Sequence, residues 1–282
     1  MKHGSLYVPV LALAAFALPT AVRAETLAPL DRYSLSIGAY RASNDVGLNW
    51  EPSNGTLPGS HLDLDRDLGL DLDRTEGLLE AAATFGHGGA SHHRHKLELF
   101  RYGYDASSSR TLDGEYRIGD DVFVEGAVFE GDFDVRLLGA SYTWFFHHDD
   151  RSAFGVGVGA IRYRVSAAFA AAAVEGEGQV DAVSAAMSES AWVPQVHAEY
   201  VRSLSPHWRV GADASFVKKS GGGVSGKAID VGAKVDYFHW QHFGFSLRYN
   251  YNDIDLDFEK SRFTGGIDIK TRGPQLLATL RF

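Results

Sequence analysis

Apolar and polar side chains alternate with a period of two along much of this chain. In residues 243–251, for example, Phe243, Phe245 and Leu247 alternate with glycine or polar residues. Successive side chains of an extended strand point to opposite faces, so this period predicts strands with one apolar and one polar face. Beyond residue 24, no run is long and apolar enough for a transmembrane helix. The sequence therefore predicts an all-β fold.

The alternation predicts about ten strands, and counts of eight and twelve stay open as alternatives. The segments are residues 33–42, 75–85, 92–105, 130–146, 153–168, 191–204, 208–219, 227–237, 243–251 and 265–282. Within residues 153–168 the parity of the pattern changes near Arg162, which predicts either a β-bulge or the edge of a membrane. An even number of strands would put both ends of the sheet on one side.

Two further patterns favour a closed membrane barrel over a soluble sandwich. Aromatic residues recur at the ends of the predicted strands, as an interfacial girdle requires. They are Trp144, Phe146, Trp192, Trp208, Tyr237 and Phe243. Short connections, such as residues 147–152 and 205–207, also alternate with longer ones, such as residues 43–74 and 106–129. Because only helices and closed barrels satisfy every backbone group in lipid, we predict an antiparallel up-and-down transmembrane β-barrel.

The last strand carries a recognisable ending. Leu276, Ala278, Leu280 and Phe282 form its apolar face, and Phe282 is aromatic. This pattern resembles the C-terminal signature of bacterial outer-membrane β-barrels. The resemblance implies a bacterial outer-membrane location, a last strand that closes the barrel, and recognition of these four residues by the outer-membrane insertion machinery.

The first 24 residues are typical of a cleaved signal peptide. Lys2 lies before the apolar run 6–18, and small residues precede an expected cleavage after Ala24. We therefore predict a signal peptide at 1–24 and one barrel domain at 25–282, because no Pro/Gly/Ser-rich linker divides the remainder.

The net charge and the absence of cysteine limit the classes of partner and chemistry that are expected for this chain. Removing Lys2 and Arg23 from the 27 basic residues leaves 25 against 36 acidic ones, a net charge of −11. A nucleic-acid partner would need a basic stripe, so none is expected. Cysteine is absent, which excludes disulfide and thiol chemistry. We expect contacts with membrane lipid and lipopolysaccharide, a monomer, and no cofactor.

Three short motifs carry a second resemblance. They are the Asp-Leu-Gly-Leu-Asp run at 67–71, the Arg-His-Lys-Leu-Glu-Leu run at 94–99, and Phe-Gly-Phe at 243–245. Their order resembles a family of uncharacterised small proteobacterial outer-membrane barrels. This resemblance implies the barrel fold and carries no established activity.

An acidic run follows the first predicted strand. It contains Asp63, Asp65, Asp67, Asp71 and Asp73. Alternating carboxylates are suitable oxygen ligands for a hard cation such as calcium. The EF-hand pattern fails, however, because Leu68 and Arg74 take the places of its glycine and glutamate. We expect an acidic extracellular segment that is solvated or close to lipopolysaccharide-bound cations.

Histidines gather at the short connections. Nine of the 12 lie there: His87, His92, His93, His95, His147, His148, His207, His239 and His242. Within this set, His92, His93, His95, His147 and His148 are the candidates for a zinc or copper site, and titration with pH is an alternative. No spacing fixes a metal geometry, so we expect these histidines to bind water and lipid headgroups.

His197 lies well inside a predicted strand, with Glu199 two residues later on the same inward face. Together they are candidates for a general base and its carboxylate, as in a lipid A-modifying or other lipid-modifying enzyme. The pair lies near the middle of the strand and no nucleophile is marked. We therefore expect a lumen-filling role and leave the enzyme as the alternative.

The inward face of the predicted barrel carries both charges. Its charged residues are Glu76, Glu80, Lys96, Glu98, Glu199, Arg209, Asp213, Asp230, Lys234, Asp236 and Arg248. A barrel of about ten strands has a lumen that side chains largely fill, and unpaired buried charge is costly. We predict cross-lumen pairing, and a structural or interaction barrel with acidic loops that conducts at most small solutes. A small-solute channel is the other alternative.

Overall fold

The structure, a computed structural model, describes ten ranges of the chain. They are residues 27–52, 60–63, 73–86, 94–111, 116–118, 121–123, 126–175, 179–221, 224–260 and 263–282. The predicted signal peptide lies outside these ranges, and so do Asp65, Asp67, Asp71, His87, His92 and His93. Among the described residues, no helix is long and apolar enough to cross a membrane.

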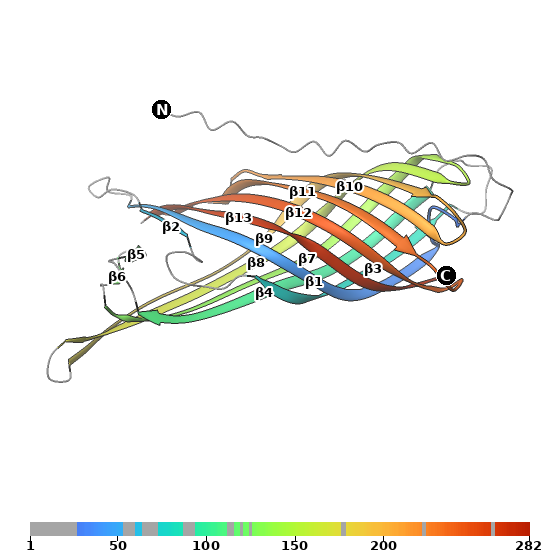
Figure 1. The fold of residues 1–282 in the computed structure, drawn as a ribbon. Helices are drawn as coiled ribbons and strands as arrows, with labels where there is room; N and C mark the ends of the chain where they lie inside the picture. Colours follow the sequence, from blue (N-terminus) through green and yellow to red (C-terminus); the bar gives the residue numbers. More distant parts are fainter. Residues whose placement is uncertain are drawn as a thin grey trace, which may run out of the picture.

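Ten long antiparallel strands form a closed barrel (Figure 1). They are β1 (Tyr33–Pro52), β3 (Arg74–Phe85), β4 (Arg94–Thr111), β7 (Val128–His148), β8 (Ser152–Glu175), β9 (Gln179–Ser203), β10 (Trp208–Lys219), β11 (Val224–Tyr237), β12 (Phe243–Lys260) and β13 (Phe263–Arg281). Neighbours in sequence pair around the barrel, and β13 pairs with β1 to close it. The up-and-down barrel and the count of ten are confirmed.

Three short strands add to these ten. β2 (Ser60–Asp63) pairs with β1 and belongs to the barrel sheet, whereas β5 (Tyr116–Ile118) and β6 (Asp121–Phe123) pair with each other and form a separate two-stranded sheet. In the sequence they lie between β1 and β3 and between β4 and β7, and in space they lie at the end of the barrel away from Phe282 (Figure 1).

The strands extend further than the sequence pattern indicates. Residues 169–175 and 179–190, predicted to be a connection, are paired strand in β8 and β9. This run is rich in alanine, so it lacks the contrast between apolar and polar residues that makes a period of two visible. These residues are strand because their backbones form the ladder of hydrogen bonds with the neighbouring strands, although no side-chain pattern marks them.

Near the short turns the outward face of the strands is apolar and the inward face is polar, and further along the strands this is reversed. On β7, Leu138 and Trp144 point outward and are exposed, while Thr143 points inward and is buried. Further from the short turns, Phe133 and Val135 are the buried inward residues and their outward neighbours are polar. The burial pattern alternates through the whole exchange, so the same side of the strand always faces the lumen.

β8 makes the same exchange at Arg162. Val156 and Val158 are exposed outward residues before this point, whereas Tyr163 and Val165 are buried inward residues after it. Because pairing with β7 and β9 continues without a register shift here, the parity change is the membrane edge and not a bulge. Lipid therefore contacts the apolar outward face up to Arg162, and water contacts the polar outward face beyond it.

An apolar core fills the lumen beyond the membrane edge. Its buried residues are Val46, Ala127, Phe129, Phe133, Val135, Leu137, Ile161, Tyr163, Val165, Ala167, Val193, Val217, Ala228, Ile254, Ile267 and Ile269. The part of the barrel that stands in water is thus built like a soluble β-barrel, with its apolar residues inside. We call this part the outer extension.

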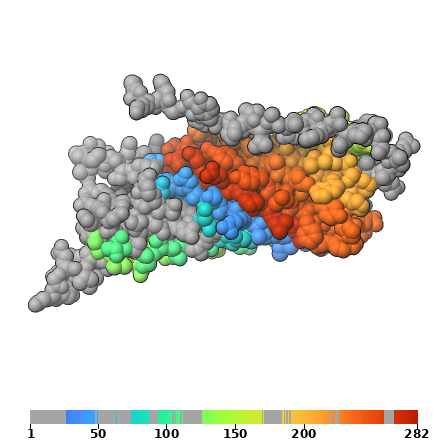
Figure 2. All heavy atoms as spheres, viewed as in Figure 1, coloured from blue at the N-terminus to red at the C-terminus, as the bar shows by residue number. Residues whose placement is uncertain are grey.

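The lipid belt is apolar and broad. Ile37, Val158 and Leu276 are 64%, 59% and 59% exposed, although they are aliphatic side chains on paired strands. Water would make so large an exposed apolar surface unfavourable, and lipid removes that cost. Figure 2 shows the side chains of β11, β12 and β13 forming one continuous wall on this face. The belt and the closed barrel place the chain in the bacterial outer membrane.

Short turns and aromatic pairs mark one rim. Residues 149–151, 204–207 and 238–242 connect strands there, and Tyr33 and Phe282 exchange backbone hydrogen bonds at the same rim. The rings of Trp208 and Tyr237 lie 4.7 Å apart. Short turns face the periplasm in barrels of this type, so the outer extension faces the exterior.

Candidate functional site

Residues 27–32, which we call the strap, cross the periplasmic mouth of the barrel. Leu27 and Leu30 are buried, and Leu30 packs with Phe145 and Ala153. The strap is also tied by its backbone, because the amide of Thr84 donates to the carbonyl of Arg32 at 2.8 Å. The segment just before β1 therefore lies in the mouth of the barrel and not in solvent.

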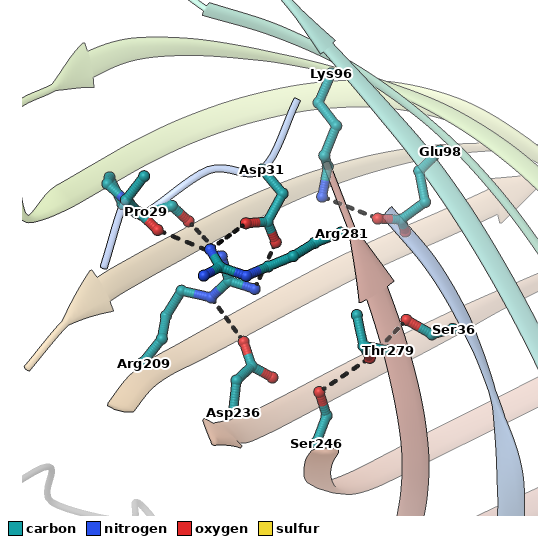
Figure 3. Close-up of polar contacts among 11 residues, drawn as sticks. Pro29, Asp31, Ser36, Lys96, Glu98, Arg209, Asp236, Ser246, Thr279 and Arg281 are labelled. Carbon is teal, nitrogen blue, oxygen red and sulfur yellow. Dashed lines mark hydrogen bonds and ion pairs between the residues drawn. The ribbon is translucent and has the colours of Figure 1, made fainter. Parts of the chain in front are cut away.

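Arg209 on β10 holds the strap in place (Figure 3). Its guanidinium contacts Asp31 at 2.9 Å and Asp236 at 2.8 Å. It also donates to the backbone carbonyl of Pro29 at 3.3 Å. Arg209 and Asp236 are buried, so each charge is stabilised by an opposite one and not by water. A planar, five-donor group is suited to joining several oxygens at once.

A second arginine, Arg281, completes the charged cluster at the periplasmic mouth. Arg281 on β13 contacts the other carboxylate oxygen of Asp31 at 3.1 Å. Both guanidinium groups lie over the buried ring of Phe238, at 5.1 Å for Arg209 and 4.4 Å for Arg281. The cluster of Asp31, Arg209, Asp236, Arg281 and Phe238 joins the strap, β10, β11 and β13, and we call it the periplasmic plug.

A layer of ion pairs crosses the lumen above the plug. Lys96 on β4 pairs with Glu98 at 2.9 Å and also with Glu199 on β9. On the other side of the lumen, Arg248 on β12 pairs with Asp213 at 2.6 Å and with Glu80 at 3.3 Å. The predicted cross-lumen pairing of inward charges is confirmed for these residues. We call them, together with Lys234, the ion-pair layer.

The ion-pair layer divides the interior into two small cavities. The cavity toward the plug has a volume of about 80 Å³ and is lined by Asp31, Ser36, Arg209 and Thr279 in addition to the layer. The cavity toward the exterior has a volume of about 120 Å³. Each has space for a few water molecules.

The apolar core closes the larger cavity on its outer side. Phe100, Ile161 and Tyr163 line that cavity and belong to or pack against the core. Phe100 lies against Gly139 on β7, where a Cβ atom would overlap its ring. Phe100 has the same inward parity as Lys96 and Glu98, and the apolar layer inside the lumen explains why an aromatic residue occupies this face.

Polar groups of the larger cavity gather at Asp230. Its carboxylate accepts hydrogen bonds from the amides of Asn250 at 2.6 Å and Asn252 at 3.1 Å. Sequence reasoning did not single out these asparagines, nor Asp31 in the strap. Only their places in the sequence could have indicated them. The asparagines lie at inward-facing positions of β12, and Asp31 comes directly before the first strand.

The candidate catalytic residues His197 and Glu199 both point into the lumen. The ring Nε2 of His197 contacts the hydroxyl of Thr143 at 2.8 Å, and Gly157 leaves the room for this ring. Glu199 instead pairs with Lys96. Both residues line the larger cavity, between the ion-pair layer and the apolar core. Each one thus has a partner other than its predicted companion.

The described histidine candidates make separate contacts along the periplasmic rim. His95 contacts the hydroxyl of Tyr142 at 2.6 Å, and His147 lies 3.6 Å from Asp149. His148 is half-buried at the end of β7. Within the described part of the chain, no group of three or more His, Cys, Asp and Glu residues is arranged to hold a metal ion.

Asp149 caps the turn between β7 and β8. Its carboxylate accepts from the backbone amides of Arg151 and Ser152, both at 2.7 Å, and from the Ser152 hydroxyl at 2.8 Å. These hydrogen bonds, that from the Arg151 amide first, lower the pKa of Asp149 from 3.8 to about 2.

The remaining candidates lie at the two ends of the barrel wall. Leu276 and Leu280 face lipid on β13, with Ala278 between them and Phe282 exposed at the rim. Asp63 is in β2, on the exterior side. Recognition of the β13 residues by the insertion machinery stays a prediction.

Comparisons with known proteins bear on the fold. No family model matches the chain, and no curated protein matches it. Among solved structures, the outer membrane protease OmpT from Escherichia coli is similar, with a TM-score of 0.59 and 7% sequence identity over 92% of this chain and 99% of that one. The toluene transporter TodX from Pseudomonas putida has a TM-score of 0.35 at 7% identity, over 90% of this chain and 91% of that one. Similarity at this level concerns the outer-membrane barrel fold alone.

Proposed function

We propose that this chain is a closed structural barrel that anchors its outer extension above the membrane as an interaction surface. The observation that carries the proposal is the filling of the lumen at three heights, by the periplasmic plug, the ion-pair layer and the apolar core. A protein whose interior is occupied in this way acts through its outer surface.

The outer extension has the properties of a display surface. Its outward face carries Asp253, Asp255 and Asp257 on β12 and Glu130 and Asp132 on β7. Phe129, Phe133 and Ile254, which are inward neighbours of these acidic residues, belong to the apolar core, so the charged face is held by a packed interior. In this proposal the acidic display surface includes these strand residues in addition to the acidic segment predicted at residues 63–73.

Planar-bilayer recording tests this proposal. The purified full chain, inserted in a lipid bilayer, is expected to give no conductance steps. Asp31→Ala, which removes the carboxylate shared by Arg209 and Arg281, is the companion variant. We expect it also to stay silent, because the ion-pair layer and the apolar core remain. Regular conductance steps from the unaltered protein would contradict the proposal and favour the small-solute channel.

The second candidate is the lipid-modifying enzyme. The observation that favours it is that His197 lines the larger cavity and that its Nδ1 atom is buried without a hydrogen-bond partner. His197→Ala, expressed in cells beside the unaltered protein, tests it by mass spectrometry of lipid A. An unchanged lipid A profile is the expected result, and a mass difference that depends on His197 would support the enzyme.

A further inference from the structure

Three arginines follow one another on the outward face of β7 and β8, directly outside the lipid belt. Arg136 pairs in register with Arg164, and Arg162 pairs with Leu138 on one side and Trp192 on the other. Leu138 and Trp192 are belt residues, 45% and 55% exposed. The arginines therefore lie at the height of the outer-leaflet headgroups.

The arrangement is unfavourable for the protein by itself. Like charges directly opposite each other on neighbouring strands destabilise a sheet. Arg136 is compensated by Asp134, whose carboxylate accepts from its Nε atom at 3.0 Å. Arg162 and Arg164 have no ion pair or hydrogen bond with any residue that the structure describes. Two uncompensated cations thus lie beside a third, and an anion at this place would relieve the repulsion.

Hydroxyl groups complete the surface. Ser190 on β9 pairs in register with Arg164, and Ser166 contacts Ser188 at 3.1 Å. Together with Asp134, Arg136 and Arg164, these serines line an open groove of about 340 Å³ on the outer wall. Guanidinium and hydroxyl donors around one groove are the groups that bind phosphate oxygens.

We propose that this groove binds the phosphate of an outer-leaflet lipid headgroup, with the acyl chains lying along the belt below it. The apolar residues directly beneath the arginines favour a lipid over free phosphate, because one molecule then contacts both surfaces. Asp134 already pairs with Arg136, so Arg164, which lines the groove and has no ion pair with any described residue, makes the main contact, with Arg136 beside it. Lipid binding in this groove, which lies on the outer wall, does not depend on whether the lumen is closed.

Binding of defined lipids tests the proposal. The full chain is refolded in detergent without lipopolysaccharide and titrated with lipid A that carries both phosphates, with dephosphorylated lipid A, and with inorganic phosphate. We expect the double variant Arg136→Gln/Arg164→Gln to lose about ten- to hundredfold in affinity for phosphorylated lipid A. Dephosphorylated lipid A should bind the unaltered protein with a similar loss, and inorganic phosphate should not compete at equal concentration.

Arg272→Gln is the matched control. Arg272 is exposed on β13, four strands from β7 and five from β8 around the barrel, and likewise lies just beyond the belt. The Arg272→Gln variant should bind phosphorylated lipid A as tightly as the unaltered protein does. Equal loss in this control, or unchanged binding by the double variant, would overturn the proposal. Competition by inorganic phosphate would overturn the choice of a lipid headgroup.

Thermal unfolding supplies a second readout that a merely structural role would not give. Without lipid A, Arg164→Gln should raise the midpoint of unfolding, since it removes one like-charge contact. With phosphorylated lipid A present, the same variant should unfold at a lower temperature than the unaltered protein. A change of the same sign in both conditions would contradict the proposal.

Discussion

At the scale of single residues, buried charge decides how the periplasmic mouth is closed. Arg209 neutralises Asp31 and Asp236 at a place where all three side chains are buried. Removing one partner of such a cluster leaves the others as uncompensated buried charges, which costs more than the cluster itself contributes. The plug is therefore sensitive to Arg209 in a way that surface ion pairs are not.

Arg209→Ala should lower the free energy of unfolding by about 3–5 kcal/mol. Urea unfolding of the barrel in phospholipid vesicles measures it. The control is Arg202→Ala on β9, an exposed arginine close to the same rim, which should change the free energy by about 0–1 kcal/mol. Equal effects of the two variants would contradict the role assigned to Arg209.

Asp149 makes a pH-dependent contribution with a definite sign. Its pKa is lowered in the folded state, so its turn hydrogen bonds stabilise the folded protein above its ordinary value of 3.8 and are lost as the pH falls toward about 2. Carboxyl NMR in detergent micelles should show Asp149 titrating near pH 2. Ser152→Ala, which removes one donor, should raise this pKa, and an unshifted titration in that variant would exclude the hydroxyl as a cause.

At the scale of elements, each long strand passes through two environments with opposite rules. In lipid the outward face is apolar, and in water the outward face is polar while the inward face is apolar. β8 contains both within one unbroken ladder, with Arg162 at the boundary. The backbone pairing of β8 is thus continuous, while the face that carries its apolar side chains changes from outward to inward at Arg162.

The inversion can be measured on β8 by placing an arginine at two outward positions. Val158→Arg places a cation in the lipid belt and should cost about 2–4 kcal/mol, whereas Ser166→Arg on the same outward face lies beyond the belt and should cost about 0–1 kcal/mol. Unfolding in vesicles by urea gives both values. A cost for Ser166→Arg as large as that for Val158→Arg would place the membrane edge further out.

This inversion also explains what the sequence could reveal. Strands were evident wherever lipid and lumen gave opposite faces, as in residues 243–251, and the count of ten followed from them. Residues 252–260 fall outside the strand predicted for residues 243–251, and the structure shows that the parity of their pattern is exchanged, with Asp253 outward and Ile254 inward. The alanine run of β8 had no pattern at all.

The luminal site was predictable only in part. Inward charges were recognisable from parity, which is why Lys96 and Glu199 were expected to face the lumen. Their partners were not, because strand tilt and stagger decide which inward residues meet across the barrel. Asp31 lies outside any strand, so no periodicity could place it beneath Arg209.

At the scale of the whole molecule, one sheet encloses two kinds of interior. The membrane part is filled by ion pairs and small cavities, and the outer extension by an apolar core. The same closed sheet satisfies the backbone in both parts, so no edge is exposed to lipid. The outward face therefore passes from lipid to water at Arg162, while the lumen stays closed along the whole barrel.

Single cysteines along β8 test this claim most directly, because the chain contains no cysteine of its own. Each variant is folded in vesicles and treated with a membrane-impermeant maleimide. Cysteines at Val156 and Val158 should stay unlabelled in lipid, and those at Arg164 and Ser166 should be labelled rapidly. Cysteines at Tyr163 and Val165 should stay unlabelled, because they lie in the apolar core. Rapid labelling at Tyr163 and Val165 would mean a water-filled lumen and would contradict the account.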